Sequence, residues 1–168
     1  MKSIKYILLP LLLLLLCSCG TERSEYLNYQ SYPLRVLAEA EYGGESYTFS
    51  LSLEGDGSCR MDFLEPETLS GFSLSRKDGE MSLSFEDISL PLGKREDVGI
   101  LSLAEFFRLD KKRISAVDIE EQNGLRLNVL SLDGGSTRLY INSDTSLPLR
   151  IEGEAEGKPL LLKIIEIG

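Results

Sequence analysis

Carboxylates are the most numerous side chains in this chain of 168 residues that could take part in chemistry. The sequence holds 27 Asp and Glu against 18 Lys and Arg, which gives a formal net charge of −9, and it holds no His. Without His there is no imidazole base, no His-containing nucleophilic triad and no His ligand for a metal. Glu152, Glu154 and Glu156 alternate along one strand face, where side chains project in parallel about 6–7 Å apart. We therefore expect a solvated outer face there, with no metal bound.

No other arrangement of acids or hydroxyls marks a catalytic centre. Glu54 and Asp56 lie among glycines, but the spacing of a calcium-binding loop is absent, so we interpret them as a turn. Paired carboxylates could hydrolyse glycosides, yet nothing distinguishes one pair among so many acids. The Gly-x-Ser-x-Gly and Ser-x-x-Lys motifs are absent, as are the phosphate-binding glycine patterns. We expect no catalytic residue, no cofactor and no enzyme activity.

The acidic balance also excludes one class of partner. Nucleic-acid binding needs clustered cations that displace counterions, so we expect no nucleic-acid partner. Of the three cysteines, Cys59 stands apart from Cys17 and Cys19, and the sequence gives it no His or obvious cationic partner to activate it. We expect Cys59 to be a packed strand residue and not a reactive thiol.

The first segment of the chain has the order of a targeting signal. Lys2 and Lys5 precede an apolar run over residues 7–16, which is too short to span a bilayer that needs about 20 residues. The run ends in Leu-Cys-Ser-Cys-Gly over residues 16–20, which resembles the lipobox of bacterial lipoproteins. In that resemblance Cys19 is the acylated residue, because small Ser18 precedes it, whereas bulky Leu16 precedes Cys17. The alternative is an ordinary secretory signal cleaved near Ser18 or Gly20.

We therefore expect a lipoprotein signal peptide over residues 1–18 and a lipid anchor, such as one carrying palmitate, on Cys19. The protein would be exported and held at the extracytoplasmic face of the bacterial cell membrane, or at the outer membrane of a Gram-negative cell. Residues 19–33 are polar and predict a tether that holds an acidic body away from anionic headgroups. Tyr26, Tyr29 and Tyr32 interrupt this stretch, either as an aromatic stripe for a partner or, as we favour, because it folds back onto the domain.

Alternating apolar and polar residues run through the remaining domain, residues 34–168, and predict antiparallel strands. Hairpin dipeptides at 43–44, 78–79 and 123–124 separate them, and we count nine or ten strands. Residues 98–109 instead predict one helix that is apolar almost all round, hence buried or closing a concave surface. The expected fold class is mainly β (α+β). Such a sheet either closes as a filled barrel or forms an incomplete β-barrel with one or few helices over its concave face.

The turn pattern resembles a known group of proteins. The run over residues 60–72, with Pro-Glu at 66–67 and Gly71, is followed by the Asp-Gly hairpin at 78–79. Together with the Ser-Leu-Pro-Leu-Arg turn at 146–150, it looks like the LolA/LolB/LppX-like group of bacterial lipoproteins. The resemblance implies an eleven-stranded half-barrel with helices over an apolar cavity that holds acyl chains.

From these observations we expect a monomer that binds lipid or an acylated or apolar partner in a hydrophobic cavity, without catalysis. The alternative is a structural or protein-interaction module of the cell envelope with a filled core. Plain core packing is also the alternative interpretation for each residue expected to line or gate the cavity. The expected lining residues are Tyr47, Phe49, Leu51, Met61, Phe63, Leu83 and Phe85, and the expected gate residues are Phe106 and Phe107.

Overall fold

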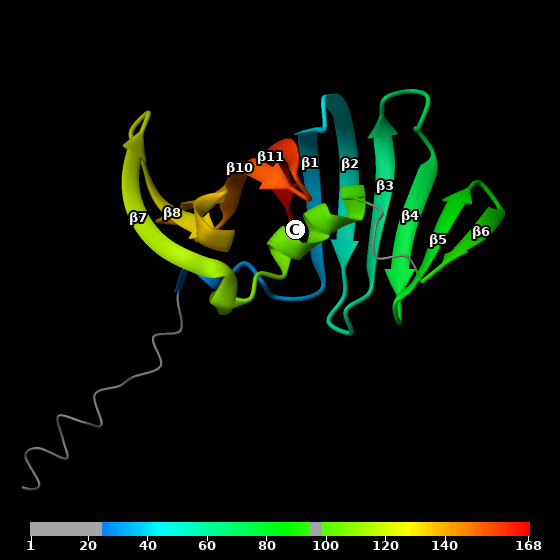
Figure 1. Ribbon diagram of the computed structural model, residues 1–168, viewed down its shortest axis with the longest axis horizontal. Coiled ribbons are helices and arrows are strands. Elements are labelled where there is room, and N and C mark those ends of the chain that lie inside the picture. Colours follow the sequence, from blue (N-terminus) through cyan, green and yellow to red (C-terminus); the bar gives the residue numbers. More distant parts are fainter. Residues whose placement is uncertain (1–24, 95–98) are drawn as a thin grey trace, which may run out of the picture.

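Eleven antiparallel strands and four short 3-10 helices make up the fold in the computed structural model, which describes residues 25–94 and 99–168 (Figure 1). The expected leader and Cys19 lie outside the described residues. The strands are β1 Leu34–Tyr42, β2 Glu45–Leu53, β3 Cys59–Glu65, β4 Phe72–Lys77, β5 Glu80–Phe85, β6 Ile88–Gly93, β7 Ile114–Gln122, β8 Leu125–Leu132, β9 Thr137–Asn142, β10 Pro148–Ala155 and β11 Lys158–Ile167. The helices are η1 Glu25–Leu27, η2 Gly99–Phe107, η3 Lys111–Arg113 and η4 Asp133–Gly135.

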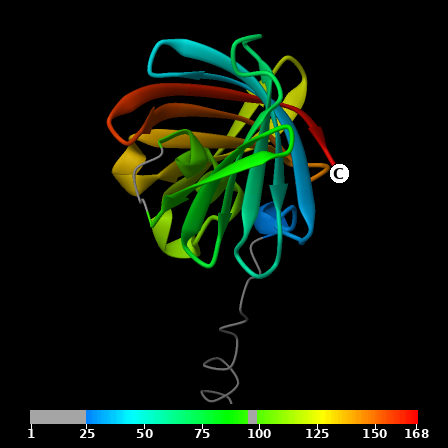
Figure 2. The ribbon, with the colours of Figure 1, turned by 90° about the vertical axis from the view of Figure 1, so that its right-hand side faces the viewer.

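All eleven strands form one sheet in the order β6-β5-β4-β3-β2-β1-β11-β10-β9-β8-β7. The sheet curls strongly but its edge strands β6 and β7 do not meet (Figures 1 and 2), so the predicted incomplete barrel is confirmed. The count of nine or ten strands was too low, because β6 was not predicted. Pro91 cannot donate to a strand ladder, and β6 accommodates it by lying at the edge of the sheet.

Two-residue turns position most of the strands. Gly43 and Gly44 have φ values of +62° and +91°, and Asn123 and Gly124 have φ values of +51° and +77°. Positive φ at both central residues is the geometry whose twist matches that of antiparallel strands. The dipeptides that predicted the hairpins are therefore the ones that form them.

The predicted helix over residues 98–109 is present, but it is the 3-10 helix η2. It crosses the concave side of the sheet (Figure 1). Its buried residues lie on two of its three sides, and the third side carries the partly exposed Ser102 and Glu105. The buried residues are Leu101, Leu103, Ala104, Phe106 and Phe107.

The segment before β1 is packed against the domain. Tyr29 is only 5% exposed and belongs to the main core cluster, and Tyr26 and Leu27 pack beside it. This supports the interpretation that the tyrosine stretch folds back. The expected tether over residues 19–33 is wrong for the described part from residue 25, because burial of Tyr29 holds that part on the domain.

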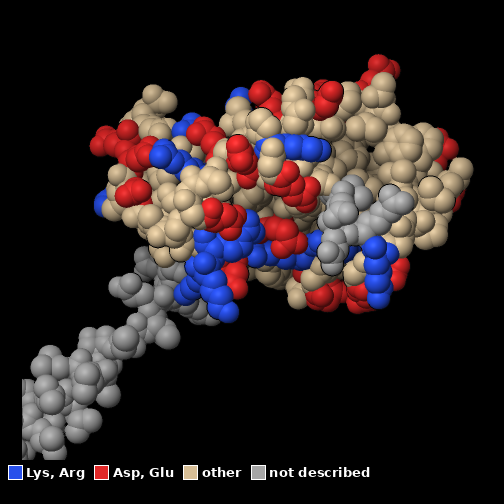
Figure 3. Space-filling model, in the orientation of Figure 1, with Lys and Arg blue, Asp and Glu red and all other residues tan. Residues whose placement is uncertain are grey.

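Acidic side chains are spread over much of the visible surface (Figure 3). Glu152 and Glu154 stand on the outer face of β10 as predicted, and Glu152 pairs with Arg150 at 3.0 Å. Glu156 lies beyond the end of β10, in the following turn, with its Oε2 3.5 Å from the Tyr42 hydroxyl. Within the described ranges, no helix is long and apolar enough to cross a membrane.

Candidate apolar binding face

The core-facing side of the sheet carries an apolar surface that changes from covered to uncovered toward β6. One row of directly paired residues crosses from β2 to β6 and consists of Leu51, Met61, Leu74, Leu83 and Leu90. Exposure along this row rises from 0% at Leu51 and Met61 to 7% at Leu74 and 56% at Leu90. The row therefore leaves the protein core before it reaches the edge of the sheet.

A second row behaves in the same way. Phe72, Phe85 and Ile88 pair across β4, β5 and β6, and the rings of Phe72 and Phe85 stack at 4.5 Å between centroids. Phe85 is 38% exposed and Ile88 is 71% exposed. We call the exposed residues of the two rows, Phe85, Ile88 and Leu90, the β5–β6 patch. Large apolar side chains that gather in this way mark interaction surfaces more often than scattered ones do.

The opposite face of the same strands carries serine hydroxyls. The hydroxyls of Ser75 and Ser82 lie 2.8 Å apart, and Ser84 donates to Ser89 at 3.2 Å. Successive side chains of a strand point to opposite faces, so this end of the sheet is apolar inside and polar outside. The β5–β6 patch is therefore a property of one face only.

Four of the seven residues expected to line a cavity are buried in the core. Tyr47 and Leu83 are partly buried against this core, and Phe85 is exposed in the β5–β6 patch. The expected gate residues, Phe106 and Phe107, are buried between η2 and the sheet and do not lie at the entrance of a cavity. The fully buried members, all at most 5% exposed, are Phe49, Leu51, Met61, Phe63, Phe106 and Phe107.

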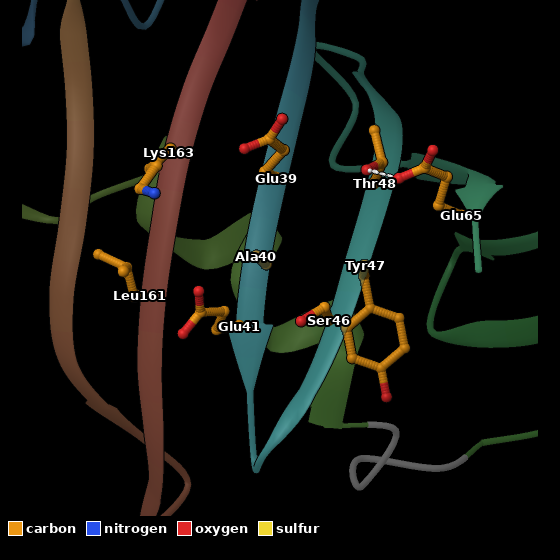
Figure 4. A pocket seen from close by; sticks show the side chains of 9 residues that line it. All are labelled: Glu39, Ala40, Glu41, Ser46, Tyr47, Thr48, Glu65, Leu161 and Lys163. Atoms are coloured by element: carbon orange, nitrogen blue, oxygen red, sulfur yellow. Dashed lines mark hydrogen bonds between the residues drawn. The ribbon is translucent and has the colours of Figure 1, made fainter.

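Tyr47 also lines a small hollow on the outer face of β1, β2 and β11 (Figure 4). Its volume is about 180 Å³, and its walls include Glu39, Glu41 and Lys163. Thr48 donates to Glu65 at its rim over 2.9 Å. A hollow so small and polar does not match the apolar cavities of about 300–1,000 Å³ that hold small ligands.

A charged pair fixes η2 to the sheet. Arg76 of β4 contacts Glu105 of η2 with 2.6 Å between Nη2 and Oε1. The hydrogen bond to Glu105 raises the pKa of Arg76, so the guanidinium stays charged. Arg76 is also the cross-strand partner of Cys59, a cation that the sequence did not place there. Cys59 itself is free and 3% exposed, in agreement with the predicted packed strand residue.

Two tyrosines fix the end of η2. The Tyr29 hydroxyl donates to the Phe106 carbonyl and the Tyr32 hydroxyl to the Phe107 carbonyl, each at 3.1 Å. The last carbonyls of a helix have no partner within it, so these bonds satisfy groups that would otherwise be unpaired. Burial raises the pKa of Tyr29 to about 12. The three-residue spacing of the tyrosines was the sequence signal for this clamp, but its target could not be read from it.

Arg108, directly after η2, is the third attachment. Its Nη2 donates to the Glu54 carbonyl at 2.8 Å and to the Ser58 carbonyl at 2.5 Å, in the turn between β2 and β3. The predicted turn at Glu54 and Asp56 is therefore present, and Arg108 is bound to it. In the described part of the chain, no group of three or more Cys, Asp or Glu is placed to hold a metal ion.

No protein-family model matches the chain, and no curated protein sequence matches it. Several solved structures, in contrast, superpose on this chain. An uncharacterized conserved protein from Thermus thermophilus superposes with a TM-score of 0.57 at 14% identity, covering 86% of this chain and 82% of that one. MucB superposes with a TM-score of 0.51 at 18% identity, covering 86% of this chain and 57% of MucB. Lipoprotein LppX from Mycobacterium tuberculosis gives 0.47 at 11% identity, covering 83% and 89%.

These likenesses concern the fold. The chain has the open eleven-stranded half-barrel that its turn pattern predicted, and it shares this fold with the Thermus thermophilus protein and with MucB. It spans a little over half of the MucB chain.

Proposed function

We propose that this protein is an exported, lipid-anchored binding protein without catalytic activity. Its β5–β6 patch would hold an acyl chain or the apolar segment of an acylated partner. The observation that carries the proposal is the uncovered end of the core-facing side, where Phe85, Ile88 and Leu90 are 38%, 71% and 56% exposed.

The patch has the size of a modest binding surface. Burying an exposed apolar side chain completely contributes about 1.5–3 kcal/mol. Scaled by the exposed fractions of its three residues, full coverage of the patch would contribute about 3 kcal/mol. Contacts with the half-buried Phe72 and Leu83 beneath it would add to this value. An acyl chain suits such a surface, because each buried methylene contributes about 0.8 kcal/mol without needing a polar partner.

The proposed anchor rests on the residue order around Cys19. The described chain begins at Glu25, six residues later, so a lipid on Cys19 would hold the domain close to the membrane. The fold of the described residues needs no disulfide, and Cys59 is buried. Mass spectrometry of the protein from the membrane fraction should find an acylated Cys19 at the mature N-terminus. An unmodified Cys19 would contradict the anchor.

A second function is favoured by the packing of the core. Phe49, Leu51 and Phe107 are 0% exposed, so the middle of the barrel is filled by η2 and leaves no room for a chain there. The protein would then act as an interaction module of the cell envelope, with β6 as an exposed edge. An exposed edge strand can pair with the strand of a partner.

Titration with a fluorescent fatty acid separates the two functions. Protein stripped of copurifying lipid would be compared with the Leu90→Asp variant and with the Ser89→Asp variant. Ser89 is the neighbour of Leu90 on the opposite face of β6, so both variants add the same charge to the same strand. We expect saturable binding that weakens about tenfold in Leu90→Asp and is retained in Ser89→Asp.

Binding that is absent in the unchanged protein, or that responds equally to both variants, would refute the acyl-binding function and leave the interaction module. Thermal unfolding of each variant controls for loss of fold. Both positions are exposed, so the unfolding midpoints should stay close together. Lipids that copurify with the protein, identified by mass spectrometry, would name the acyl class.

A further inference from the structure

The two edges of the open sheet differ in what their main chains offer to another chain. β6 ends one side of the sheet and β7 the other, and within the described residues no strand pairs with the outer edge of either. An edge strand leaves every second N–H and C=O along its outer side unpaired, and these groups can pair with a strand of another protein. The register of each hairpin tells which residues carry the unpaired groups.

The unpaired groups of β7 form an uninterrupted row. The two-residue turn at 123–124 makes Gln122 and Leu125 a hydrogen-bonded pair, and bonded and non-bonded pairs alternate from there along the hairpin. Arg126 agrees with this alternation, because its carbonyl accepts a hydrogen bond from the Ser143 main-chain nitrogen at 2.9 Å and so points away from β7. β7 contains no proline, so no N–H is missing from the row. The residues whose main-chain groups point to the outer edge are Val117, Ile119 and Glu121.

The row on β6 is shorter and interrupted. Its hairpin turns at 86–87, so the same alternation directs the main-chain groups of Ser89 and Pro91 to the outer edge. Proline has no N–H to donate, and a register shift opposite Met81 and Ser82 follows it. In this strand, Ser89 alone offers both an N–H and a C=O before the shift. β7 is therefore the edge that can accept a further strand.

The side chains of β7 are exposed as well as its edge. Val117 is 42% exposed and Ile119 is 61% exposed. Both lie on the core-facing side, since Val117 pairs with the buried Leu130 and successive odd residues share a face. Asp118 and Glu120 alternate with them and lie on the outer face. An added strand would cover the two apolar side chains and would place its alternate residues beside the two acids.

The part of the sheet that contains β7 is acidic when every charge is counted. Residues 114–155, from β7 to β10, hold seven Asp and Glu against three Arg and no Lys. One of these arginines, Arg150, pairs with Glu152 at 3.0 Å. The cations of η3 precede β7, about 14 Å along the strand from Asp118 and about 20 Å from Glu120. These separations exceed the Debye length of about 8 Å at physiological salt, so η3 offsets the two acids only weakly.

The other two arginines offset part of the acid charge on β7. Arg126 is the cross-strand partner of Glu121 on the core-facing side, so these two charges balance each other. Arg138 interacts electrostatically with both Asp118 and Glu120. One cation cannot balance two carboxylates, and the outer face of β7 keeps a net negative charge. Basic residues in an added strand would therefore be favoured on that face.

We propose that β7 binds an extended segment of another protein as an additional antiparallel strand, in which apolar residues alternate with Lys or Arg. The apolar residues cover Val117 and Ile119, and the basic residues lie beside Asp118 and Glu120. A second copy of this chain fits less well. With Ile119 opposite itself, Asp118 of each copy would face Glu120 of the other, and like charges directly opposite destabilise a strand pair.

This binding site is separate from the proposed acyl-binding surface. β7 and the β5–β6 patch lie at opposite ends of the long axis in Figure 1, so both can be occupied at once. The inference depends neither on acyl binding nor on the lipid anchor. It also assigns partner binding to a different edge from β6, because main-chain hydrogen bonds supply much of the affinity when a strand is added to a sheet.

Amide hydrogen exchange followed by NMR tests which edge is used. The probe is a synthetic peptide in which Val and Lys alternate, and the matched control peptide has Glu in place of Lys. In the free protein the amides of Val117, Ile119 and Glu121 should exchange rapidly, whereas those of Asp118 and Glu120 are paired with β8 and exchange slowly. The Lys peptide should slow the first three about tenfold and leave the other two unchanged. Unchanged exchange of the first three at about 1 mM peptide would overturn the inference.

A proline substitution separates the main-chain contribution from that of the side chain. Ile119→Pro removes one outward N–H, and proline is tolerated in an edge strand where its nitrogen faces solvent. Ile119→Ala removes the same apolar side chain and keeps the N–H. Fluorescence anisotropy of the labelled Lys peptide should show binding about tenfold weaker in Ile119→Pro than in Ile119→Ala. Equal binding by the two variants would contradict pairing through the main chain, and thermal unfolding checks that both remain folded.

Charge reversal tests the stated chemistry of the partner. Asp118→Lys should weaken binding of the Lys peptide about fivefold. Glu154→Lys changes the net charge equally on β10, three strand spacings or about 14 Å from β7, and should leave binding unchanged. Equal effects of the two variants, or equal binding of the Lys and Glu peptides, would overturn the proposed basic partner. A dimer in size-exclusion chromatography that Ile119→Pro abolishes would also overturn it, because a second copy would then occupy β7.

Discussion

Replacing Tyr29 by Phe removes a single hydroxyl from the clamp that holds the end of η2. The Tyr29 hydroxyl lies 3.1 Å from the Phe106 carbonyl, and the Gln30 amide donates to the same hydroxyl at 3.3 Å. Tyr29 is 5% exposed, so water does not readily replace the lost group. A buried acceptor left without its partner costs about 1–3 kcal/mol. We expect Tyr29→Phe to lower the free energy of unfolding by about 2 kcal/mol.

Tyr32→Phe is the matched control. Its hydroxyl makes a bond of the same length, 3.1 Å, to the neighbouring carbonyl of Phe107. Tyr32 is 36% exposed, so water can reach the carbonyl once the hydroxyl is gone. The expected loss is about 0.5 kcal/mol, at the low end for a hydrogen bond that water can replace.

Urea unfolding followed by circular dichroism measures both values on the same protein. The two variants differ in burial and share bond type and length, so the comparison isolates burial. Equal losses, or a larger loss in Tyr32→Phe, would refute the reasoning that η2 is held by a buried hydrogen bond at Tyr29.

Three further predictions follow from local geometry. Because burial raises the pKa of Tyr29 to about 12, Tyr29 ionises in the unfolded chain before it does so in the folded one. The free energy of unfolding therefore falls as pH rises from about 10, by about 2 kcal/mol at pH 12. Urea unfolding at increasing alkaline pH should show a smaller decrease in Tyr29→Phe, and the same decrease in both proteins would contradict this prediction. Arg113 lowers the pKa of Asp133 below its usual value of 3.8. The ionised carboxylate therefore stabilises the folded state above pH 3.8, and this contribution is lost as pH falls through the lowered pKa. Asp133→Asn should remove under about 1 kcal/mol and flatten that acid dependence, and unchanged acid unfolding would argue against the pair. Gly153 has φ +137°, and a Cβ there would collide with the Ser136 carbonyl. Gly153→Ala should therefore lower the unfolding free energy by about 3 kcal/mol, and a chemical denaturation curve like that of the unchanged protein would disprove this close approach.

Local patterns predicted the strands well where turn chemistry marks their ends. The alternation begins at residue 34 and the first hairpin dipeptide is at 43–44, and β1 is Leu34–Tyr42. The Gly-Gly dipeptide at 43–44 needs positive φ at both positions, and that requirement is visible in the sequence. β6 was missed because Pro91 is typical of strand ends, and only the edge position reconciles it with a ladder.

Whether the concave face is filled depended on contacts that no local pattern contains. Phe49 and Leu90 both point inward, yet Phe49 is 0% and Leu90 56% exposed. The difference arises from where η2 lies, and η2 is fixed by pairs distant in sequence. Tyr29 and Phe106 are 77 residues apart, and Arg76 and Glu105 are 29 apart. Alternation identifies which face is inward but not which part of that face another element covers.

The place of β11 in the sheet has a consequence for the order in which the protein can fold. β11 is the strand that pairs with both β1 and β10, so it joins the β1–β6 hairpin series to the β7–β10 series. A chain that has emerged only as far as residue 157 holds two separate ribbons with no main-chain ladder between them. Strand pairing over such long sequence separations is slow. If the chain is exported as proposed, the sheet is completed only when residues 158–167 arrive. The strand order would then postpone completion of the sheet until the whole domain has crossed the membrane.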